Sequence, residues 1–353
     1  RAYIPTSPLH GWGRPESMTE GDSHYWGVWW GKEPFDAYRE KVGRFMSEYG
    51  FQAFPDPATI RKFTAPEDRV LGSKVMKAHQ KHPTGFETID EYLLRDYRKP
   101  KDFESYAYVS QLLQAEGIVS AIGAHRRAMP RCMGTMYWQL NDCWPVVSWS
   151  SRDYYGRKKA LHYALPSAYE KVLINPVLED GRVKVYISSE LQETPTCLMT
   201  VKVLDFDGNL YSDEGFSVDI PAQTSDIYYD TVLSSLIGNL DPRKTIVLAT
   251  LKLPDRLNLL VKNILYLVPP KELDLPQPAI TREVTAIPGG YRVTVTTDKL
   301  VKNAWFSTPV AGEFSNNYFD ILPGESVTVD FMTKKKHPKM ADQIRIRSLA
   351  DSY

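Results

Sequence analysis

The sequence predicts a multidomain protein in which a mixed α/β region is followed by two all-β regions. In residues 1–168, short apolar runs alternate with helical stretches, a pattern typical of βα units around a parallel sheet. From about residue 169, alternating strands separated by turn residues take over, which is typical of a β-sandwich. A proline-rich stretch then precedes a second small all-β region.

Residues 1–168 contain apolar runs that predict buried strands, each ending in polar or aromatic residues. The runs are AYIPTSP (2–8), HYWGVWW (24–30), RFMSEYGFQAFP (44–55) and CMGTMYWQLND (132–142). Between the last two, residues 105–129 place Val109, Leu112, Ile118 and Ile122 at helical spacing. Strands separated by helices favour a parallel sheet.

The rest of the chain divides into a predicted sandwich, a linker and a second β region. In residues 169–268 the predicted strands are 183–190, 197–206, 215–222, 245–254 and 263–269, with turn signals at Glu-Asp-Gly 179–181 and Asp-Gly-Asn 207–209. Residues 269–278 carry four prolines, so we expect an extended and stiff connection. Residues 279–353 again alternate like strands.

Composition excludes several classes of protein. Lys plus Arg and Asp plus Glu both number 43, so no net field favours nucleic acid or an anionic membrane. No apolar run approaches the ~18 residues of a membrane span. Three cysteines without regular spacing argue against a disulfide framework or a zinc site. The 12% aromatic content fits either a sugar-binding cleft or large β-rich cores.

The predicted strand ends carry the candidate site. In a βα barrel, reactive groups lie at the carboxyl ends of strands. Glu48 ends the third predicted strand, and Trp26, Trp30 and Trp138 lie at the ends of two others. A carboxylate among aromatic faces suits glycosidic chemistry, because indoles stack on pyranose rings and the carboxylate attacks an oxocarbenium-like centre. The alternative is that Glu48 is a salt-bridged or solvated residue at a strand end.

Other residues near these ends keep two interpretations each. His24 either hydrogen-bonds a sugar hydroxyl or the carboxylate, or packs under its loop. Asn141 and Asp142 either hold the last loop or contact sugar. Strand alternation points Trp29 away from Trp30. We expect Trp144 and Trp149 in a core or domain interface, and Cys132 and Cys143 as free thiols.

Several of these segments together resemble glycoside hydrolase family 2 β-mannosidases. RFMSEYGFQAFP resembles the nucleophile segment, and CMGTMYWQLNDCWPVVSWSSRDYYGRKKALHY (132–163) the last barrel strand of that family. RAYIPTSP, GDSHYWGVWWGKEPFDAY and SNNYFDILPGE (315–325) are also similar to family segments. The resemblance implies that Glu48 is the nucleophile of a retaining exo-acting enzyme, with Trp26, Trp30 and Trp138 lining the terminal-sugar subsite. It implies no cofactor and no metal.

The resemblance also implies a domain plan. Residues 1–168 would be half of a (β/α)8 TIM barrel, holding strands five to eight. Residues 169–268 would be an Ig-like β-sandwich, 269–278 a Pro-rich linker, and 279–353 a smaller Ig-like sandwich. A complete barrel needs ~250 residues, so we expect this chain to be the C-terminal part of a longer enzyme whose N-terminal remainder is its partner.

One difference between this sequence and the family pattern leaves other functions open. The family carries its general acid as a Glu after an Asn, and no Asn-Glu pair occurs in this sequence. The acid is expected on the N-terminal part; otherwise Glu16 or Asp22 would have to act. β-Galactosidase, β-glucuronidase and a non-catalytic carbohydrate-binding chain stay as alternatives to a β-mannoside hydrolase. Because none of the nine Asn residues lies in a glycosylation sequon, a periplasmic or secreted bacterial location is favoured over a lysosomal one, with a cytoplasmic location still open.

Overall fold

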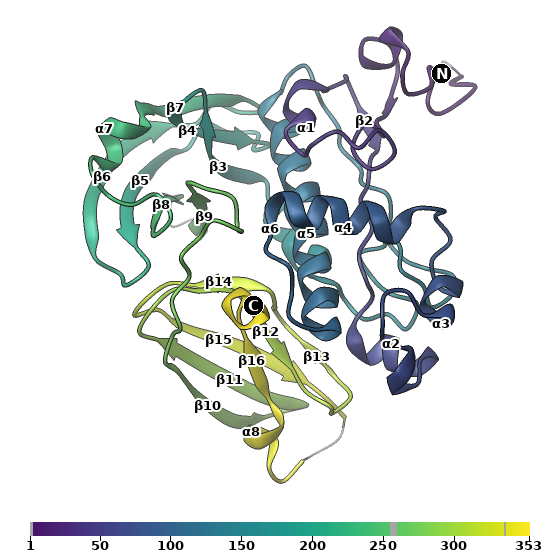
Figure 1. Ribbon diagram of the computed structural model, residues 1–353. Coiled ribbons are helices and arrows are strands. Elements are labelled where there is room, and N and C mark those ends of the chain that lie inside the picture. Colours follow the sequence, from purple (N-terminus) through teal and green to yellow (C-terminus); the bar gives the residue numbers. More distant parts are fainter. Residues whose placement is uncertain (1–2, 255–259, 335–336) are drawn as a thin grey trace.

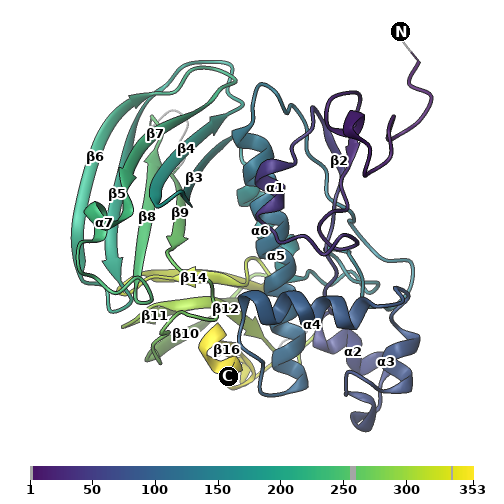
Figure 2. The same cartoon turned by 45° about the horizontal axis from the view of Figure 1, so that its top comes forward.

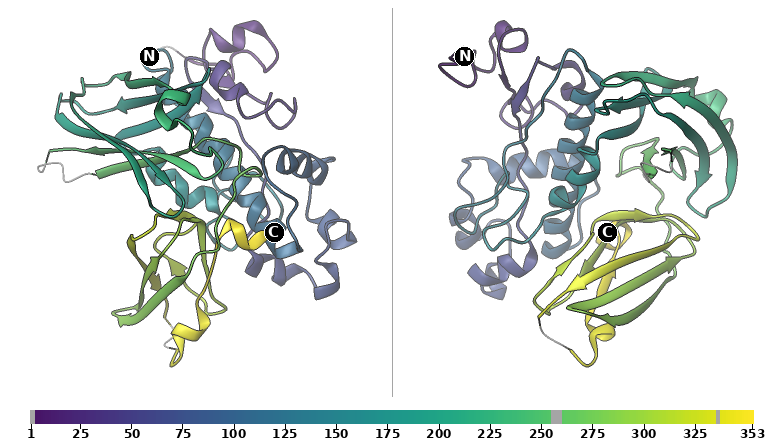
Figure 3. Two further views of the ribbon diagram at one scale, coloured as in Figure 1. Left: turned by 60° about the vertical axis from the view of Figure 1, so that its left-hand side comes forward. Right: turned by 180° about the vertical axis from the view of Figure 1, so that it is seen from behind.

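The computed structural model describes residues 3–254, 260–334 and 337–353. Its N-terminal region is mainly helical, and two regions of antiparallel sheet follow it along the chain (Figure 1). The long helix α5 lies between the rest of the N-terminal region and the two β regions (Figures 1 and 3). Within the described part of the chain, no helix combines the length and apolar character that crossing a bilayer requires.

The N-terminal region is organised around α5 (Phe103–Arg127), which confirms the helix predicted at 105–129. Asp102 caps its start by accepting a hydrogen bond from the Ser105 amide at 2.7 Å, and Arg126 and Arg127 in its last turn complement the helix dipole. The other helices are α1 (Ala37–Glu40), α2 (Pro57–Phe63), α3 (Lys74–Ala78), α4 (Gly85–Asp96) and α6 (Ala160–Ala168). Two 3-10 turns span Pro15–Met18 and Pro66–Asp68.

The strands of this region are shorter than predicted. β1 (Ser23–His24) pairs in parallel with β2 (Met46–Glu48), and Thr135 forms one parallel bridge with Met46. Thus the segment 132–142 contributes a bridge rather than the expected strand. The strand predicted at 2–8 is wrong for the described residues 3–8, which form none. Tyr3 and Ile4 are 87% and 76% exposed, so no neighbouring strand or core offers these residues a partner.

The first β region forms two antiparallel sheets around one core. One sheet has the order β3 (Val172–Glu179), β4 (Arg182–Ser189), β7 (Ser225–Val232). The other has the order β6 (Leu210–Asp219), β5 (Thr196–Asp205), β8 (Thr245–Lys252), β9 (Leu260–Tyr266), and α7 spans Leu233–Ile237. Alternate residues of β5 (Cys197, Met199, Val201, Val203) point into the core. The predicted all-β character is confirmed, although β3 and β7 were not predicted.

The second β region repeats this arrangement on a smaller scale. Its larger sheet has the order β10 (Ile280–Ile287), β11 (Gly290–Thr297), β15 (Ser326–Met332), β13 (Glu313–Phe314). Its smaller sheet has the order β14 (Phe319–Ile321), β12 (Val301–Ser307), β16 (Arg345–Arg347). The helix α8 (Met340–Gln343) and a 3-10 turn at Leu349–Ser352 end the chain. Valine and phenylalanine side chains fill the space between the sheets.

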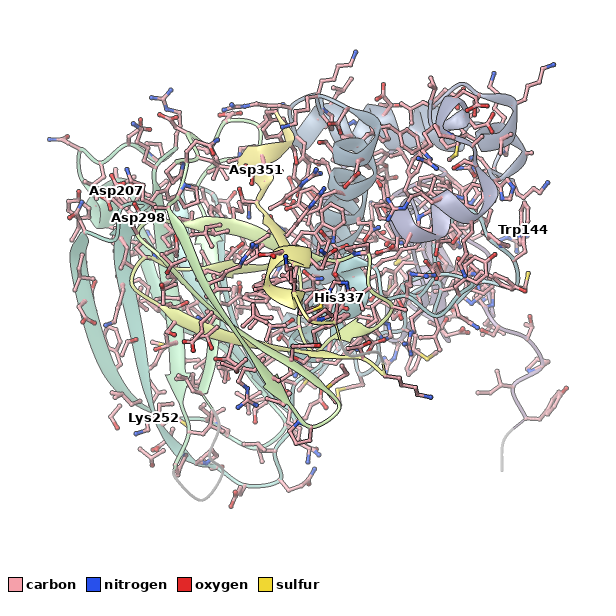
Figure 4. All side chains as sticks on the ribbon, turned by 90° about the horizontal axis from the view of Figure 1, so that it is seen from below. Trp144, Asp207, Lys252, Asp298, His337 and Asp351 are labelled. Atoms are coloured by element: carbon pink, nitrogen blue, oxygen red, sulfur yellow. The ribbon has the colours of Figure 1, made fainter. Side chains whose placement is uncertain are left out.

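The three regions lie against one another (Figure 2), and side-chain hydrogen bonds connect them. Tyr108 of α5 donates a hydrogen bond to the Asn303 carbonyl at 2.6 Å, and its ring stacks on Trp305. Arg98 donates to the carbonyls of Lys271 and Leu273 at 2.8 Å each, so the proline-rich stretch is held against the end of α4. Figure 4 shows Asp207 and Asp298 close together where the β regions meet, far from Trp144.

Candidate active site

Glu48 lies at the carboxyl end of β2, and side chains hold both of its carboxylate oxygens. The indole nitrogen of Trp26 donates to Oε1 at 3.0 Å, and Nδ1 of His24 lies 3.4 Å from Oε2. The Tyr25 amide donates to the Glu48 carbonyl at 2.8 Å, which ties the two strand ends together. The Glu48 side chain is still 21% exposed, so a ligand can reach a carboxylate whose orientation is already set.

Asp22 supports this arrangement from behind His24. Its Oδ2 accepts hydrogen bonds from Ser47 at 2.5 Å and Ser7 at 2.6 Å, and it lies 3.9 Å from Nε2 of His24. Burial alone would raise the pKa of Asp22, but the Ser47 and Ser7 hydrogen bonds hold it below its ordinary value. Asp22 is therefore ionised near neutral pH.

The backbone of Trp138 lies next to the residue that follows Glu48. Its amide donates to the carbonyl of Tyr49, the residue after Glu48, at 2.7 Å. A Cβ at Gly50 would overlap the Trp138 carbonyl oxygen, so only glycine permits this close approach. The Trp138 side chain is 44% exposed, and its Trp138–Gln139 peptide is cis. An accessible indole therefore lies beside the Glu48 strand.

Trp29 and Trp30 diverge, as expected, but for a different reason. Residues 27–30 form a turn, not a strand, and Trp29 has a positive φ of 80°. Trp29 is 1% exposed and packs edge-on against Phe51, whereas Trp30 is 51% exposed and lies on the His82 ring at 4.1 Å. The contacts of the described residues join Trp30 to His82 rather than to Glu48.

The remaining aromatic and polar candidates hold loops. Trp149 is partly buried and packs edge-on against Trp26 at 6.3 Å. Trp144 stacks on His79 at 5.1 Å, at the far edge of the helical region (Figure 4). Asp142 accepts hydrogen bonds from two serine hydroxyls of its own loop, at 2.7 and 2.6 Å.

The cysteines and other ionisable groups form no further centre near Glu48. Cys132, Cys143 and Cys197 are all free thiols. Among the described residues, no group of three His, Cys, Asp or Glu side chains has the geometry to hold a metal ion. A cavity of about 410 Å³ lies elsewhere, lined by His125, Arg126 and Tyr169 among others, and contains none of the candidate residues.

Sequence analysis missed the supporting partners of Glu48. The sequence motifs indicate Asp22 only as a substitute acid, and they do not indicate Ser7 or Ser47. A signal for Asp22 does exist in the sequence: residues 22, 24 and 26 alternate along an extended segment and so share one face. The opposite face carries Ser23 and Tyr25, which are 1% and 3% exposed. Ser7 has no such signal, because its contact to Asp22 crosses an irregular loop.

The two β regions are Ig-like domains. Residues 181–272 match the mannosidase Ig/CBM-like domain family, and residues 275–352 match an Ig-fold domain family of mannosidases. Over 93% of its length the chain is 28% identical to beta-mannosidase B of Aspergillus niger, and over 99% it is 28% identical to beta-mannosidase A of Emericella nidulans. It spans only 41% and 43% of those relatives.

Solved structures agree. A beta-D-mannosidase from Dictyoglomus thermophilum superposes with a TM-score of 0.83 at 27% identity, over 93% of this chain and 40% of the other. An exo-chitosanase from Amycolatopsis orientalis, at 16% identity and a TM-score of 0.66, shares the fold over 90% of this chain and 44% of its own. The resemblance to the C-terminal part of a glycoside hydrolase family 2 β-mannosidase is thereby confirmed.

Proposed function

We propose that this chain supplies the nucleophile of a retaining exo-β-mannosidase, which removes terminal non-reducing β-D-mannose. The observation that carries the proposal is the Glu48 carboxylate, accessible at a strand end and held by Trp26 on one oxygen and His24 on the other. The β-mannosidases that match nearly the whole chain favour mannoside over other glycosides as substrate.

In this proposal, Glu48 acts by attack on the anomeric carbon. A bond forms between a Glu48 oxygen and that carbon while the glycosidic carbon–oxygen bond breaks, and a general acid protonates the departing oxygen. Water then cleaves the glycosyl-enzyme with the configuration retained. Trp26 and His24 keep the attacking oxygen aimed before sugar arrives, which removes much of the entropic cost of alignment. Trp138 and Trp30 offer exposed indole faces for the sugar ring.

We propose that the general acid comes from a part of the protein outside this sequence. Asp22 is a poor acid, since its lowered pKa leaves it without a proton to give near neutral pH. The parallel order of β1, β2 and the bridge at Thr135 supports residues 1–168 as half of a (β/α)8 TIM barrel. The proposed domain limits stay at 169–268, 269–278 and 279–353.

A glycoside panel tests the function on the full-length protein. We expect faster turnover of 4-nitrophenyl β-mannoside than of the matching galactoside, glucuronide or glucosaminide. A 2-deoxy-2-fluoro-mannoside with a good leaving group should label the peptide that contains Glu48. Preference for another glycoside would overturn the mannosidase assignment, and a label on another carboxylate would overturn the role of Glu48.

The isolated chain tests where the acid lies. Residues 1–353 alone should hydrolyse no glycoside, because protonation of the leaving oxygen is missing, a contribution of typically ~10²–10⁴-fold. Addition of the remainder of the enzyme should restore turnover. An active isolated chain would place the acid within this sequence, and loss of that activity in Glu16→Gln would identify it.

A further inference from the structure

Two segments carry the proposed site, and few backbone hydrogen bonds join them. We define the nucleophile segment as residues 48–53 and the tryptophan segment as residues 138–151. The Trp138 amide donates to Tyr49 at 2.7 Å, and Ala53 and Ser148 exchange amide–carbonyl bonds of 2.9 and 3.3 Å. No regular ladder connects them along the described chain. Their spacing therefore depends on side chains from elsewhere.

Lys159 is the first of these side chains. It precedes α6 and is 0% exposed, a rare situation for a lysine. Its Nζ donates to the Ala53 carbonyl and to the Ser148 carbonyl, at 3.1 Å each. One ammonium thus bridges the nucleophile segment and the tryptophan segment. Among the described residues, no carboxylate lies within ion-pair distance of it, so the two carbonyls are its principal partners.

Gln114 of α5 makes a second bridge between the same segments. Its side chain is 0% exposed, and Nε2 donates to the Phe51 carbonyl at 2.8 Å and to the carbonyls of Trp149 and Ser150 at 3.1 and 3.3 Å. Phe51 belongs to the nucleophile segment, and the other two residues belong to the tryptophan segment. A residue of α5 and the residue that precedes α6 therefore present buried donors to the same pair of segments.

We propose that Lys159 and Gln114 are positioning residues that set the spacing between the nucleophile segment, which carries Glu48, and the tryptophan segment, which carries Trp138. The hydrogen bonds of Lys159 and Gln114 do not depend on the substrate. Only their expected effect on catalysis rests on the proposed function. Neither side chain contacts the Glu48 carboxylate. Both act on the backbone that follows Glu48 and Trp138, where a 1 Å displacement is enough to change a rate by ~10²-fold.

The two substitutions differ in what they leave unpaired. Gln114→Leu removes the hydrogen bonds that Nε2 gives to the Phe51 and Ser150 carbonyls, whereas Lys159→Met spares both of its acceptors. In Lys159→Met, the carbonyls of Ala53 and Ser148 keep their backbone hydrogen bonds, so no acceptor becomes unpaired. Methionine has similar length without a buried charge, and replacing buried charge by apolar atoms is often neutral or stabilising. Gln114→Leu removes an amide whose Oε1 already has no hydrogen-bond partner in the described structure.

Hydrogen exchange of the full-length protein tests the bridges without any substrate. Lys159→Met and Gln114→Leu should each speed exchange in peptides covering 48–55 and 138–151 by roughly tenfold or more, since local opening there becomes easier. Lys158→Met is the matched control: its Nζ pairs with Glu313 at 2.7 Å, and exchange in these peptides should not change. Unchanged exchange in both test variants would overturn the proposal, and so would complete unfolding of both.

Kinetics of the full-length protein then test the catalytic consequence. Both variants should lose about 10–100-fold in kcat, while KM stays within roughly threefold, because sugar stacking tolerates a small shift that bond formation does not. Lys158→Met should match wild type in both. Equal kcat in all forms would overturn the positioning role. A wild-type protein without glycosidase activity would instead refute the proposed function, and the exchange result would still stand by itself.

Discussion

The N-terminal region and the two β regions differ in how their backbone is held. In the first β region, β5 pairs with β6 over Thr196–Leu204 and with β8 over Leu198–Asp205, in nearly unbroken ladders. In the N-terminal region, β1 and β2 share only two register pairs, with an irregularity between them. In the β regions, backbone hydrogen bonds join neighbouring strands along their length. In the N-terminal region, side chains such as Lys159 and Gln114 also join the backbone segments.

Both parts expose some apolar side chains, such as Leu198 (50%) and Leu260 (64%) in the first β region, but the pattern of exposure differs. Met133, Met136 and Leu140 of a single N-terminal segment are 59%, 50% and 57% exposed. The paired faces of the β regions bury their alternate residues. The proposed site lies in the irregular part, where strand ends and turns leave Glu48, Trp30 and Trp138 partly or largely exposed. Regular ladders provide a scaffold, and irregular backbone provides reactive groups.

Glu48→Gln should give the largest effect. Loss of the nucleophile should lower kcat of the full-length enzyme by at least ~10⁴-fold, because no neighbouring group replaces a missing covalent step. Steady-state turnover of an aryl β-mannoside measures it. The matched control in the other part of the molecule is Glu272→Gln, whose side chain is exposed. An equal loss in both variants would break the contrast between a reactive region and a scaffold.

Lys159→Met should give the next largest effect, a change in how the free energy of unfolding depends on pH. Burial lowers the pKa of Lys159 to about 8, against the attraction of Asp142 and Asp153. In the unfolded chain this lysine holds its proton to about pH 10.4, so between these values the unfolded state binds more protons. The free energy of unfolding of wild type should therefore rise with pH by up to ~3 kcal/mol relative to Lys159→Met.

Denaturant titrations of both forms at about pH 7 and about pH 10 measure that difference. Lys158→Met, which removes a partly exposed lysine, should show no such change. The difference in free energy of unfolding between wild type and Lys159→Met should change across this pH range. A constant difference would contradict the presence of a buried ammonium at Lys159.

Trp138 should give a smaller, graded effect. Trp138→Ala should lower kcat/KM by roughly tenfold, and Trp138→Phe by only a few-fold, since stacking needs an aromatic face and is worth about 0.5–1.5 kcal/mol. Trp144→Ala, at the far edge of the same region, should stay close to wild type. Equal small losses for both Trp138 variants would assign Trp138 to packing rather than to sugar contact.

Chelation should have no effect. The displacement at the anomeric carbon needs no metal, so EDTA should leave kcat/KM of the full-length protein unchanged. A loss of activity that Mg²⁺ restores would contradict this.

The sequence was most informative where one local pattern decides the structure. The helix at 105–129 and most strands after residue 169 follow from periodicity, since burial of one face needs only a regular spacing. The strand β3 was missed because Pro176 interrupts its apolar pattern. The strand β7 was missed because the polar residues within Ser225–Asp230 interrupt its pattern. The strand predicted at 2–8 failed because an apolar run without a neighbour has nothing to pair with.

By itself, the sequence determined the order of regions, the proximity of Glu48 to aromatic residues and the resemblance to β-mannosidases, because each depends on residues close together in the chain. Only the tertiary structure decided that Asp22 and Ser47 support His24, that Trp29 turns inward, and that Lys159 and Gln114 bridge the two segments of the site. These contacts join residues up to 106 positions apart. Such pairing is set by how the helices pack, and no local pattern of residue types records it.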